Sequence, residues 1–373
     1  MVVHLVVYQS INHSNTMNTG AGKTALVTGA SSGIGQELAK LFAQDGYNLV
    51  LVGRKEDTLD RLAEVFKSNY GTQEITVINK DLFEEDSAQD VYNQVREKGI
   101  TVNILVNDAA VSTYGKFATE TDWEREKQLI HLNVLATTQM TKLFLKDMVG
   151  RNEGRILQLA SIVAVTPFPL MAVYAATKAY IWNLTQSLIN EIKDTNVTMT
   201  ALMPNATDTN FFREAGAPKL NVEDSLDDPE MVAKDAYKAL MKGEAKVVPG
   251  GMGNKAQEML AYVSPQETLA AGMRKMLTPK KETDQDKDKS SALVWGIGFG
   301  IAVLAGFALV TAYNNSSPVD KARYRYQAGK LKDQAMSLLD DAGGSLGDAK
   351  DAAVDKWAGV KKIASQVIAN TFA

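Results

Sequence analysis

A strand-like segment followed by a glycine-rich turn and a helix-like segment constrains the fold of this chain more than any other feature. The apolar run 24–28 leads into Gly29, Gly33 and Gly35, and residues 36–43 then favour a helix. Glycines let a backbone turn tightly and approach a pyrophosphate closely, and the free N–H groups of a helix N-terminus stabilise the phosphate charge. Because the turn lies between a strand and a helix, it predicts a dinucleotide-binding site.

Strand-like and helix-like segments alternate through the rest of residues 22–278. Further strands are expected at 48–52, 75–78, 102–106, 156–159, 197–203 and 245–248, and helices at 56–66, 122–149 and 229–241. With right-handed crossovers, this order predicts an α/β fold, a doubly wound parallel sheet of the Rossmann type that binds its ligand at the carboxyl edge.

A second signature lies in the middle of the chain. Tyr174 and Lys178 are four residues apart, so on a helix they share a face. A neighbouring cation favours the phenolate, and we therefore expect Lys178 to lower the pKa of Tyr174 and make it a general acid or base. Ser161 follows a strand and is expected to hold the substrate oxygen. An ordinary helix pair is the alternative, but the nucleotide-binding pattern favours catalysis.

Together these residues resemble the short-chain dehydrogenase/reductase family, over roughly residues 22–279. The match is to its Thr-Gly-x-x-x-Gly-x-Gly loop and its Ser, Tyr, Lys set, found here as Thr28, Gly29, Gly33, Gly35, Ser161, Tyr174 and Lys178. The resemblance implies an NAD(P)-dependent enzyme that interconverts CH–OH and C=O groups on a small molecule. It also implies a homo-oligomer, and a loop at 210–228 that covers the substrate.

By the same resemblance, Asn133 completes a catalytic tetrad by holding a water that links Lys178 to solvent. Helix-surface polarity is the alternative for Asn133. Asp81 and Leu82 are implied to contact the adenine, and the segment at 204–209 the nicotinamide amide and the phosphates. The full set of expected cofactor-binding residues is Thr28, Gly29, Ser31, Ser32, Gly33, Ile34, Gly35, Arg54, Asp81, Leu82, Asn107, Ala109, Tyr174, Lys178, Thr207 and Thr209.

The turn after the strand at 102–106 departs from the family pattern. The family has Asn-Asn-Ala-Gly there, whereas this chain has Asn107, Asp108, Ala109 and Ala110. Asp108 and Ala110 are therefore departures that affect the geometry of this turn, whereas Asn107 and Ala109 are retained.

The residue after the second strand indicates the form of the cofactor. NAD-specific enzymes tend to place an acid here to bind the ribose hydroxyls, whereas the guanidinium of Arg54 suits a 2′-phosphate. NADP (NADPH) is therefore expected in preference to NAD. A solvated surface arginine is the alternative.

Composition excludes several other classes of site. The sequence has no cysteine and three histidines, which argues against disulfides, thiolate catalysis and a metal centre built from these residues. A net charge of −4 gives no indication of a nucleic-acid partner.

The ends of the chain differ in character from residues 22–278. Residues 1–21 are predicted to be an N-terminal extension and 279–291 a charged linker. Ala292–Tyr313 has 22 residues without a charge, enough to cross a bilayer, and a buried core helix is the alternative. The tail, 314–373, alternates charged and small apolar residues, which predicts amphipathic helices or a weakly ordered segment.

These features predict a single-pass membrane protein that is an NADP-dependent oxidoreductase. Because NADPH is a cytosolic reductant, the catalytic domain is expected on the cytoplasmic side. The alternative is a non-catalytic, nucleotide-sensing membrane scaffold whose tail recruits a partner.

Overall fold

The computed structural model describes residues 20–263 and 266–279. Contacts divide the chain into two units, of which the first contains residues up to 250 and 264–279. The described part of the second unit is 251–263, which forms α9 (Met252–Val263). All further description concerns the first unit.

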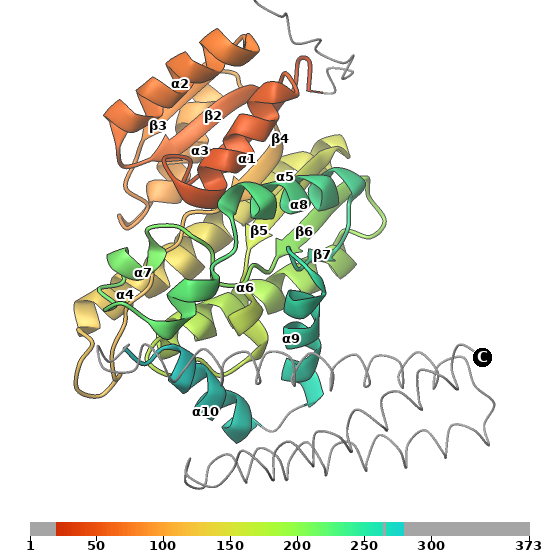
Figure 1. Ribbon diagram of the computed structural model, residues 1–373. Coiled ribbons are helices and arrows are strands. Elements are labelled where there is room, and N and C mark those ends of the chain that lie inside the picture. The colour runs from red at the N-terminus through yellow and green to blue at the C-terminus, as the bar shows by residue number, and fades with distance from the viewer. Residues whose placement is uncertain (1–19, 264–265, 280–373) are drawn as a thin grey trace, which may run out of the picture. The chain divides into compact units, whose positions relative to one another are not determined.

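A parallel sheet of seven strands, in the order β3-β2-β1-β4-β5-β6-β7, forms the centre of this unit (Figure 1). The strands are β1 (Thr24–Thr28), β2 (Asn48–Gly53), β3 (Ile75–Asn79), β4 (Val102–Asn107), β5 (Gly154–Leu159), β6 (Val197–Leu202) and β7 (Lys246–Val247). The strand order reverses between β1 and β4. At such a switch point the connections leave in opposite directions and open a crevice at the carboxyl ends of the strands. The predicted doubly wound sheet is confirmed.

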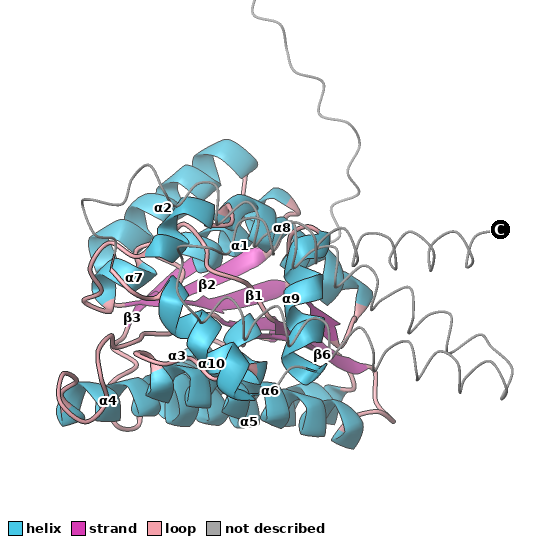
Figure 2. Cartoon of the chain, turned by 60° about the horizontal axis from the view of Figure 1, so that its bottom comes forward, coloured by secondary structure: helices cyan, strands magenta, loops and turns pink. Residues whose placement is uncertain are grey.

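Helices cover both faces of the sheet, as Figure 2 shows. One face carries α1 (Gly33–Gln44), α2 (Glu56–Tyr70) and α8 (Pro229–Lys242), and the other carries α3 (Ser87–Glu97), α5 (Thr137–Arg151) and α6 (Ala172–Glu191). The remaining helical elements of this unit are α4 (Trp123–Ile130), η1 (His131–Ala136), η2 (Ile162–Val165), α7 (Phe211–Glu214), η3 (Asn221–Ser225) and α10 (Gln266–Met276).

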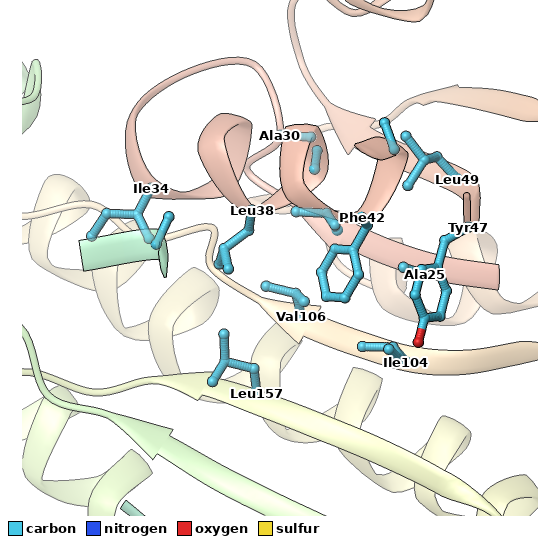
Figure 3. Packing of buried hydrophobic residues seen from close by; sticks show 14 of the residues in the cluster. Ala25, Ala30, Ile34, Leu38, Phe42, Tyr47, Leu49, Ile104, Val106 and Leu157 are labelled. Carbon is cyan, nitrogen blue, oxygen red and sulfur yellow. The ribbon is translucent and has the colours of Figure 1, made fainter. Parts of the chain in front are cut away.

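The helix after the glycine turn is fixed to the sheet by one apolar stripe. Ile34, Leu38 and Phe42 recur every four residues and share a face of α1. Figure 3 shows Leu38 and Phe42 above Val106 of the sheet, within one buried cluster. Burying a side chain of this size contributes about 1.5–3 kcal/mol, so the stripe holds the N-terminus of α1 firmly at the sheet edge.

The long helix predicted at 122–149 is three elements rather than one. Asp122 caps α4 by accepting hydrogen bonds from the N–H groups of Glu124 and Arg125. The chain then widens into the π-helix η1 before it continues as α5. Periodicity of apolar residues does not reveal one wide turn inside a long helix, and such turns are frequent at functional sites. This one contains Asn133.

Several predictions concern residues that the structure does not describe. The membrane span at 292–313, the tail, residues 280–291 of the linker and residues 1–19 all lie outside the described ranges. Within 20–263 and 266–279, no helix is both long and apolar enough to cross a bilayer. The same ranges contain no cluster of acidic or histidine side chains able to hold a metal ion.

Candidate active site

The glycine loop has a backbone geometry that favours glycine. Gly29 has φ +71° and Gly33 has φ +59°, both in the left-handed region that other residues avoid. A Cβ at Gly35 would lie 2.5 Å from Asp108 Oδ2 and 2.7 Å from the carbonyl oxygen of Gly29. The loop is therefore wrapped closely around the start of α1.

The N-terminus of α1 faces this loop without a side-chain cap. Ser32 occupies the N-cap position but makes no capping hydrogen bond, and the first turn contains no acidic residue. Thr209 approaches from the other side, because its Cγ2 would lie 3.1 Å from a Cβ at Gly33. Backbone N–H groups next to a hydroxyl suit a phosphate, so Ser32, Gly33, Ile34 and Thr209 fit the pyrophosphate of a dinucleotide.

Thr28 joins the two strands that border the crevice. Its hydroxyl accepts hydrogen bonds of 3.1 Å from the N–H groups of both Asp108 and Ala109, and donates to the carbonyl oxygen of Val106. Thr28 and Ala109 thus fix the turn after β4 against the glycine loop.

Asn107 lies at the expected place but its side chain points elsewhere. The amide donates to Thr141 Oγ1 at 3.0 Å and to Gln158 Oε1 at 3.1 Å, in the buried interior. Both amide hydrogens are therefore used within the protein, and the backbone of Asn107 is what remains for a cofactor.

The residues expected at the adenine end lie around the end of β2. The guanidinium of Arg54 is stacked 5.0 Å from the ring centre of Phe83. Asp81 Oδ1 accepts a hydrogen bond from the N–H of Phe83, and Leu82 is buried. Ser31 Oγ would lie 3.8 Å from a Cβ at Gly53, so it also borders this end of the strand.

Thr207 and Thr209 follow β6, and their hydroxyls have local partners. Thr207 Oγ1 donates to the carbonyl oxygen of Asn205 at 2.9 Å, and Thr209 Oγ1 accepts from the N–H of Phe211 at 3.3 Å. Thr209 retains its hydroxyl hydrogen for a ligand, whereas that of Thr207 is already engaged.

The structure brings Ser161, Tyr174 and Lys178 together. Ser161 lies just after β5, and its hydroxyl, which donates to the carbonyl oxygen of Pro204 at 3.4 Å, also interacts with the phenol of Tyr174 on α6. One helical turn further on, Lys178 Nζ lies 5.6 Å from the ring centre of Tyr174 and donates to the carbonyl oxygen of Leu159 at 2.7 Å. A serine, a phenol and an ammonium group therefore converge at the end of β5.

Protonation in this cluster differs from the prediction. Burial raises the pKa of Tyr174 well above its usual value, and the hydrogen bond from Ser161 offsets only part of that effect. Burial likewise lowers the pKa of Lys178 to about 8. The prediction that Lys178 lowers the pKa of Tyr174 is wrong for the protein alone, because desolvation of the buried phenol is the largest effect and the carboxyl of Asp108 acts in the same direction.

Asn133 is buried in η1, and its side chain is bound to protein groups. It accepts from the N–H of Val111 at 3.1 Å and donates to the carbonyl oxygen of Val111 at 2.9 Å. Its second donor bonds Thr177 Oγ1, which donates to the carbonyl oxygen of Tyr174. These bonds connect Asn133 to the turn of α6 that carries Tyr174, and its burial excludes the alternative of a polar residue on the helix surface.

The stretch at 210–228, expected to cover the substrate, packs against Tyr174. It contains α7 and η3, and the ring of Phe211 is centred 4.9 Å from that of Tyr174. Phe212 and Leu220 are buried in the same apolar cluster as Tyr174. Phe211 thus covers the phenol, a contact that no local sequence pattern assigns to one residue.

Comparisons with known proteins agree with this architecture. Residues 23–219 match the family described as short chain dehydrogenase. The chain is 37% identical over 185 residues to the uncharacterized oxidoreductase YvrD of Bacillus subtilis (strain 168), across 50% of this chain and 68% of the relative. It is 31% identical over 193 residues to a very-long-chain 3-oxoacyl-CoA reductase of Anas platyrhynchos, across 50% of this chain and 61% of that protein.

A solved structure gives the same result in three dimensions. The short-chain dehydrogenase from Sphingobium yanoikuyae in complex with NADPH is 30% identical, with a TM-score of 0.57 over 61% of this chain and 87% of that one. Family match, sequence identity and fold lead to one conclusion: this chain belongs to the short-chain dehydrogenase/reductase family of oxidoreductases.

Proposed function

We propose that this protein is an NADPH-dependent oxidoreductase that interconverts a carbonyl and an alcohol. The observation that carries the proposal is the cluster of Ser161, Tyr174 and Lys178 beside the glycine loop. Asp108 connects the two, because its carboxyl accepts a hydrogen bond from the backbone of Gly35 and lies within electrostatic reach of Lys178. A dinucleotide bound at the loop would therefore meet the catalytic side chains in one crevice.

NADPH, when bound, supplies the hydride. Ser161 would hold the substrate oxygen by a hydrogen bond, and Tyr174 would donate a proton to that oxygen as it gains negative charge. Because its pKa is raised, Tyr174 is protonated at neutral pH, which is the form that a proton donor requires. Phe211 covers the phenol and would exclude water from the proton transfer.

Lys178 would hold the nicotinamide ribose, and Asn133 would position the turn of α6 that carries Tyr174. The preference for NADP over NAD rests on Arg54, whose exposed guanidinium is held at the end of β2 by stacking on Phe83. The relative in complex with NADPH supports the same choice.

The test is NADPH consumption by the purified full chain against a panel of aldehydes, ketones and acyl-chain carbonyls. Tyr174→Phe should reduce turnover by at least about 100-fold, in line with the loss of a general acid, while NADPH binding is retained. Tyr180→Phe is the matched control, because Tyr180 lies on the same helix, is 41% exposed and bonds Thr138 instead of the catalytic cluster. Turnover by Tyr174→Phe at the wild-type rate would overturn the assignment.

Membrane attachment through Ala292–Tyr313, with the catalytic domain on the cytoplasmic side, is part of the proposal and rests on the sequence. The measurement is alkaline extraction of membranes from cells that produce the full chain. We expect the protein to stay in the membrane fraction, and release into the supernatant would contradict the predicted span.

A further inference from the structure

Asp108 places a carboxyl group directly beneath the glycine loop. It is the first residue after β4, and its backbone N–H is fixed by Thr28 at 3.1 Å. Its carboxyl accepts a hydrogen bond from the backbone of Gly35, and its Oδ2 would lie 2.5 Å from a Cβ at Gly35 and 3.1 Å from a Cβ at Gly29. The carboxyl group is therefore packed against the same backbone that fits the pyrophosphate.

The other carboxyl oxygen, Oδ1, has lost its contact with water and gains no hydrogen bond in return within the part of the chain that the structure describes. Oδ1 is buried and makes no hydrogen bond to the described residues. Burial raises the pKa of Asp108 to about 7, although the nearby charge of Lys178 acts in the opposite direction. The carboxyl thus changes its charge near neutral pH, where an ordinary aspartate is fully ionised.

The titratable groups that act on this carboxyl both lie on α6. They are Lys178, whose ammonium favours the carboxylate, and Tyr174, which is protonated at neutral pH. The glycine loop and β1 contribute no charged side chain at this contact, only the N–H of Gly35 and the hydroxyl of Thr28. The charge of the site near neutrality is therefore set by Asp108 and Lys178.

A dinucleotide would bring two phosphate charges to the other side of the same loop. A carboxylate behind the loop repels them, whereas the protonated carboxyl does not, and the low dielectric of a buried site strengthens the difference. A ligand that prefers one protonation state shifts the equilibrium towards it, so binding and protonation are thermodynamically linked.

We propose that Asp108 couples dinucleotide binding to proton uptake: its carboxylate takes up one proton from solution when the pyrophosphate occupies the glycine loop, so the affinity for NADPH falls as the solution becomes more alkaline. This inference rests on the proposed function, because it requires that the loop binds a dinucleotide. The family usually has an asparagine at this position, and its amide does not titrate, so this coupling to protons would be particular to a chain with an aspartate there.

Lys178 complicates the pH dependence, because it also loses its charge in the alkaline range, with a pKa of about 8. Loss of that positive charge would weaken the binding of an anion as well. The experiment must therefore compare proteins that differ at Asp108 alone, at several pH values, instead of relying on one pH profile.

The primary experiment measures the Kd for NADPH of the wild-type protein and of Asp108→Asn by NADPH fluorescence, at constant ionic strength. The Asn side chain has the same shape and no charge. We expect the ratio of the two Kd values, wild type over variant, to be near one at about pH 6 and to rise towards about ten-fold at about pH 8. In addition, calorimetry in two buffers of different ionisation enthalpy should show more proton uptake by the wild type near neutral pH.

A second pair of variants removes the contribution of the lysine. Lys178→Arg keeps a cation that does not titrate in this range, so its NADPH affinity should still fall with rising pH. The double variant Lys178→Arg with Asp108→Asn should lose that dependence. If Asp108→Asn does not fold, calorimetry of the wild type in two buffers still tests the proposal, because the absence of proton uptake on NADPH binding near neutral pH would overturn it.

The outcomes separate the two proposals. A Kd ratio that stays constant between about pH 6 and pH 8, with NADPH bound by both proteins, overturns the role of Asp108 and leaves the oxidoreductase assignment intact. Failure of the folded wild type to bind NADPH at any pH overturns both.

Discussion

The side-chain amide of Asn133 donates a hydrogen bond of 3.1 Å to Thr177 Oγ1, and Thr177 in turn donates to the carbonyl oxygen of Tyr174 at 2.7 Å. A residue of the π-helix η1 is thereby connected to the turn of α6 that carries Tyr174. Both side chains are buried, with 2% and 3% exposure respectively, so water does not replace these bonds readily. These hydrogen bonds reach the backbone of Tyr174 and thereby hold its phenol in place.

Thr177→Val should test this connection. Valine has nearly the same shape but leaves one buried donor of Asn133 without a partner, which costs about 1–3 kcal/mol of unfolding free energy. Displacement of the phenol should lower kcat by about ten-fold or more, while the Kd for NADPH changes little. Urea unfolding and steady-state kinetics measure the two effects.

Thr177→Ser serves as the control, because it keeps the hydroxyl and removes only a methyl group. It should retain most of the stability and of the activity. If valine and serine behave alike, the hydroxyl does not position Tyr174.

The features that the sequence predicts well are local ones. The run 24–28, the three glycines of the loop and the spacing of Tyr174 and Lys178 each depend on neighbours along the chain. Their structures follow from backbone preferences that hold in most surroundings. The sheet could be anticipated from the order of such segments along the chain, and the convergence of Ser161 with Tyr174 from the position of Ser161 at the end of a predicted strand.

The features that were missed depend on residues distant in sequence. The side-chain partners of Asn133 are 22 and 44 residues away, so no local pattern identifies its positioning role. The spacing of Tyr174 and Lys178 reveals a shared face but not the degree of burial, and burial decides the direction of both pKa shifts. Asp108 was noted as a departure from the family, yet only the packing against Gly35 indicates what the carboxyl does.

Gly35→Ala should disrupt the glycine loop. The new methyl group would lie 2.5 Å from Asp108 Oδ2 and 2.7 Å from the carbonyl oxygen of Gly29, and the backbone atom cannot move aside as a flexible side chain would. We expect a loss of about 1–3 kcal/mol in unfolding free energy and at least about ten-fold weaker NADPH binding. Thermal unfolding and NADPH fluorescence titration provide the measurements.

Gly150→Ala is the matched control. Gly150 lies within α5, and a Cβ there would meet no atom within 4 Å. Alanine is the better helix former, so stability should stay the same or rise by about 0.5–1 kcal/mol, with the Kd for NADPH unchanged. Equal effects of the two substitutions on NADPH binding would show that the loop geometry is not the cause.

Asp108 should also make stability depend on pH in an unusual direction. Its folded pKa of about 7 lies above the ordinary value of 3.8, so the folded protein binds more protons than the unfolded chain between these values. The contribution of Asp108 to the unfolding free energy is fully present below the ordinary pKa of 3.8, and it is lost as the pH rises through about 7. Most aspartates have the opposite effect.

Asp108→Asn removes this dependence. The variant should match the wild type near pH 4 and exceed its unfolding free energy at about pH 8 by on the order of 1–4 kcal/mol. Lys178, with a folded pKa of about 8, begins to titrate only at the alkaline end of this range, so the rise of the difference between about pH 4 and about pH 7 reports on Asp108. Urea unfolding of both proteins across the pH range is the measurement, and a constant difference between them would mean that the carboxyl is ionised throughout.

Arg54→Asp should change the cofactor preference. The guanidinium is held at the end of β2 by stacking on Phe83, and a carboxylate in its place would repel a 2′-phosphate while accepting hydrogen bonds from ribose hydroxyls. We expect the ratio of kcat/KM for NADPH to that for NADH to fall by about 10- to 100-fold, with the corresponding change in Kd.

Arg61→Asp provides the control. Arg61 is an exposed arginine of α2 that donates to the carbonyl oxygen of Asp57, and its replacement changes the net charge by the same amount. An equal shift in both variants would indicate a general effect of charge, and no shift in Arg54→Asp would make Arg54 the solvated surface residue that the sequence left as the alternative.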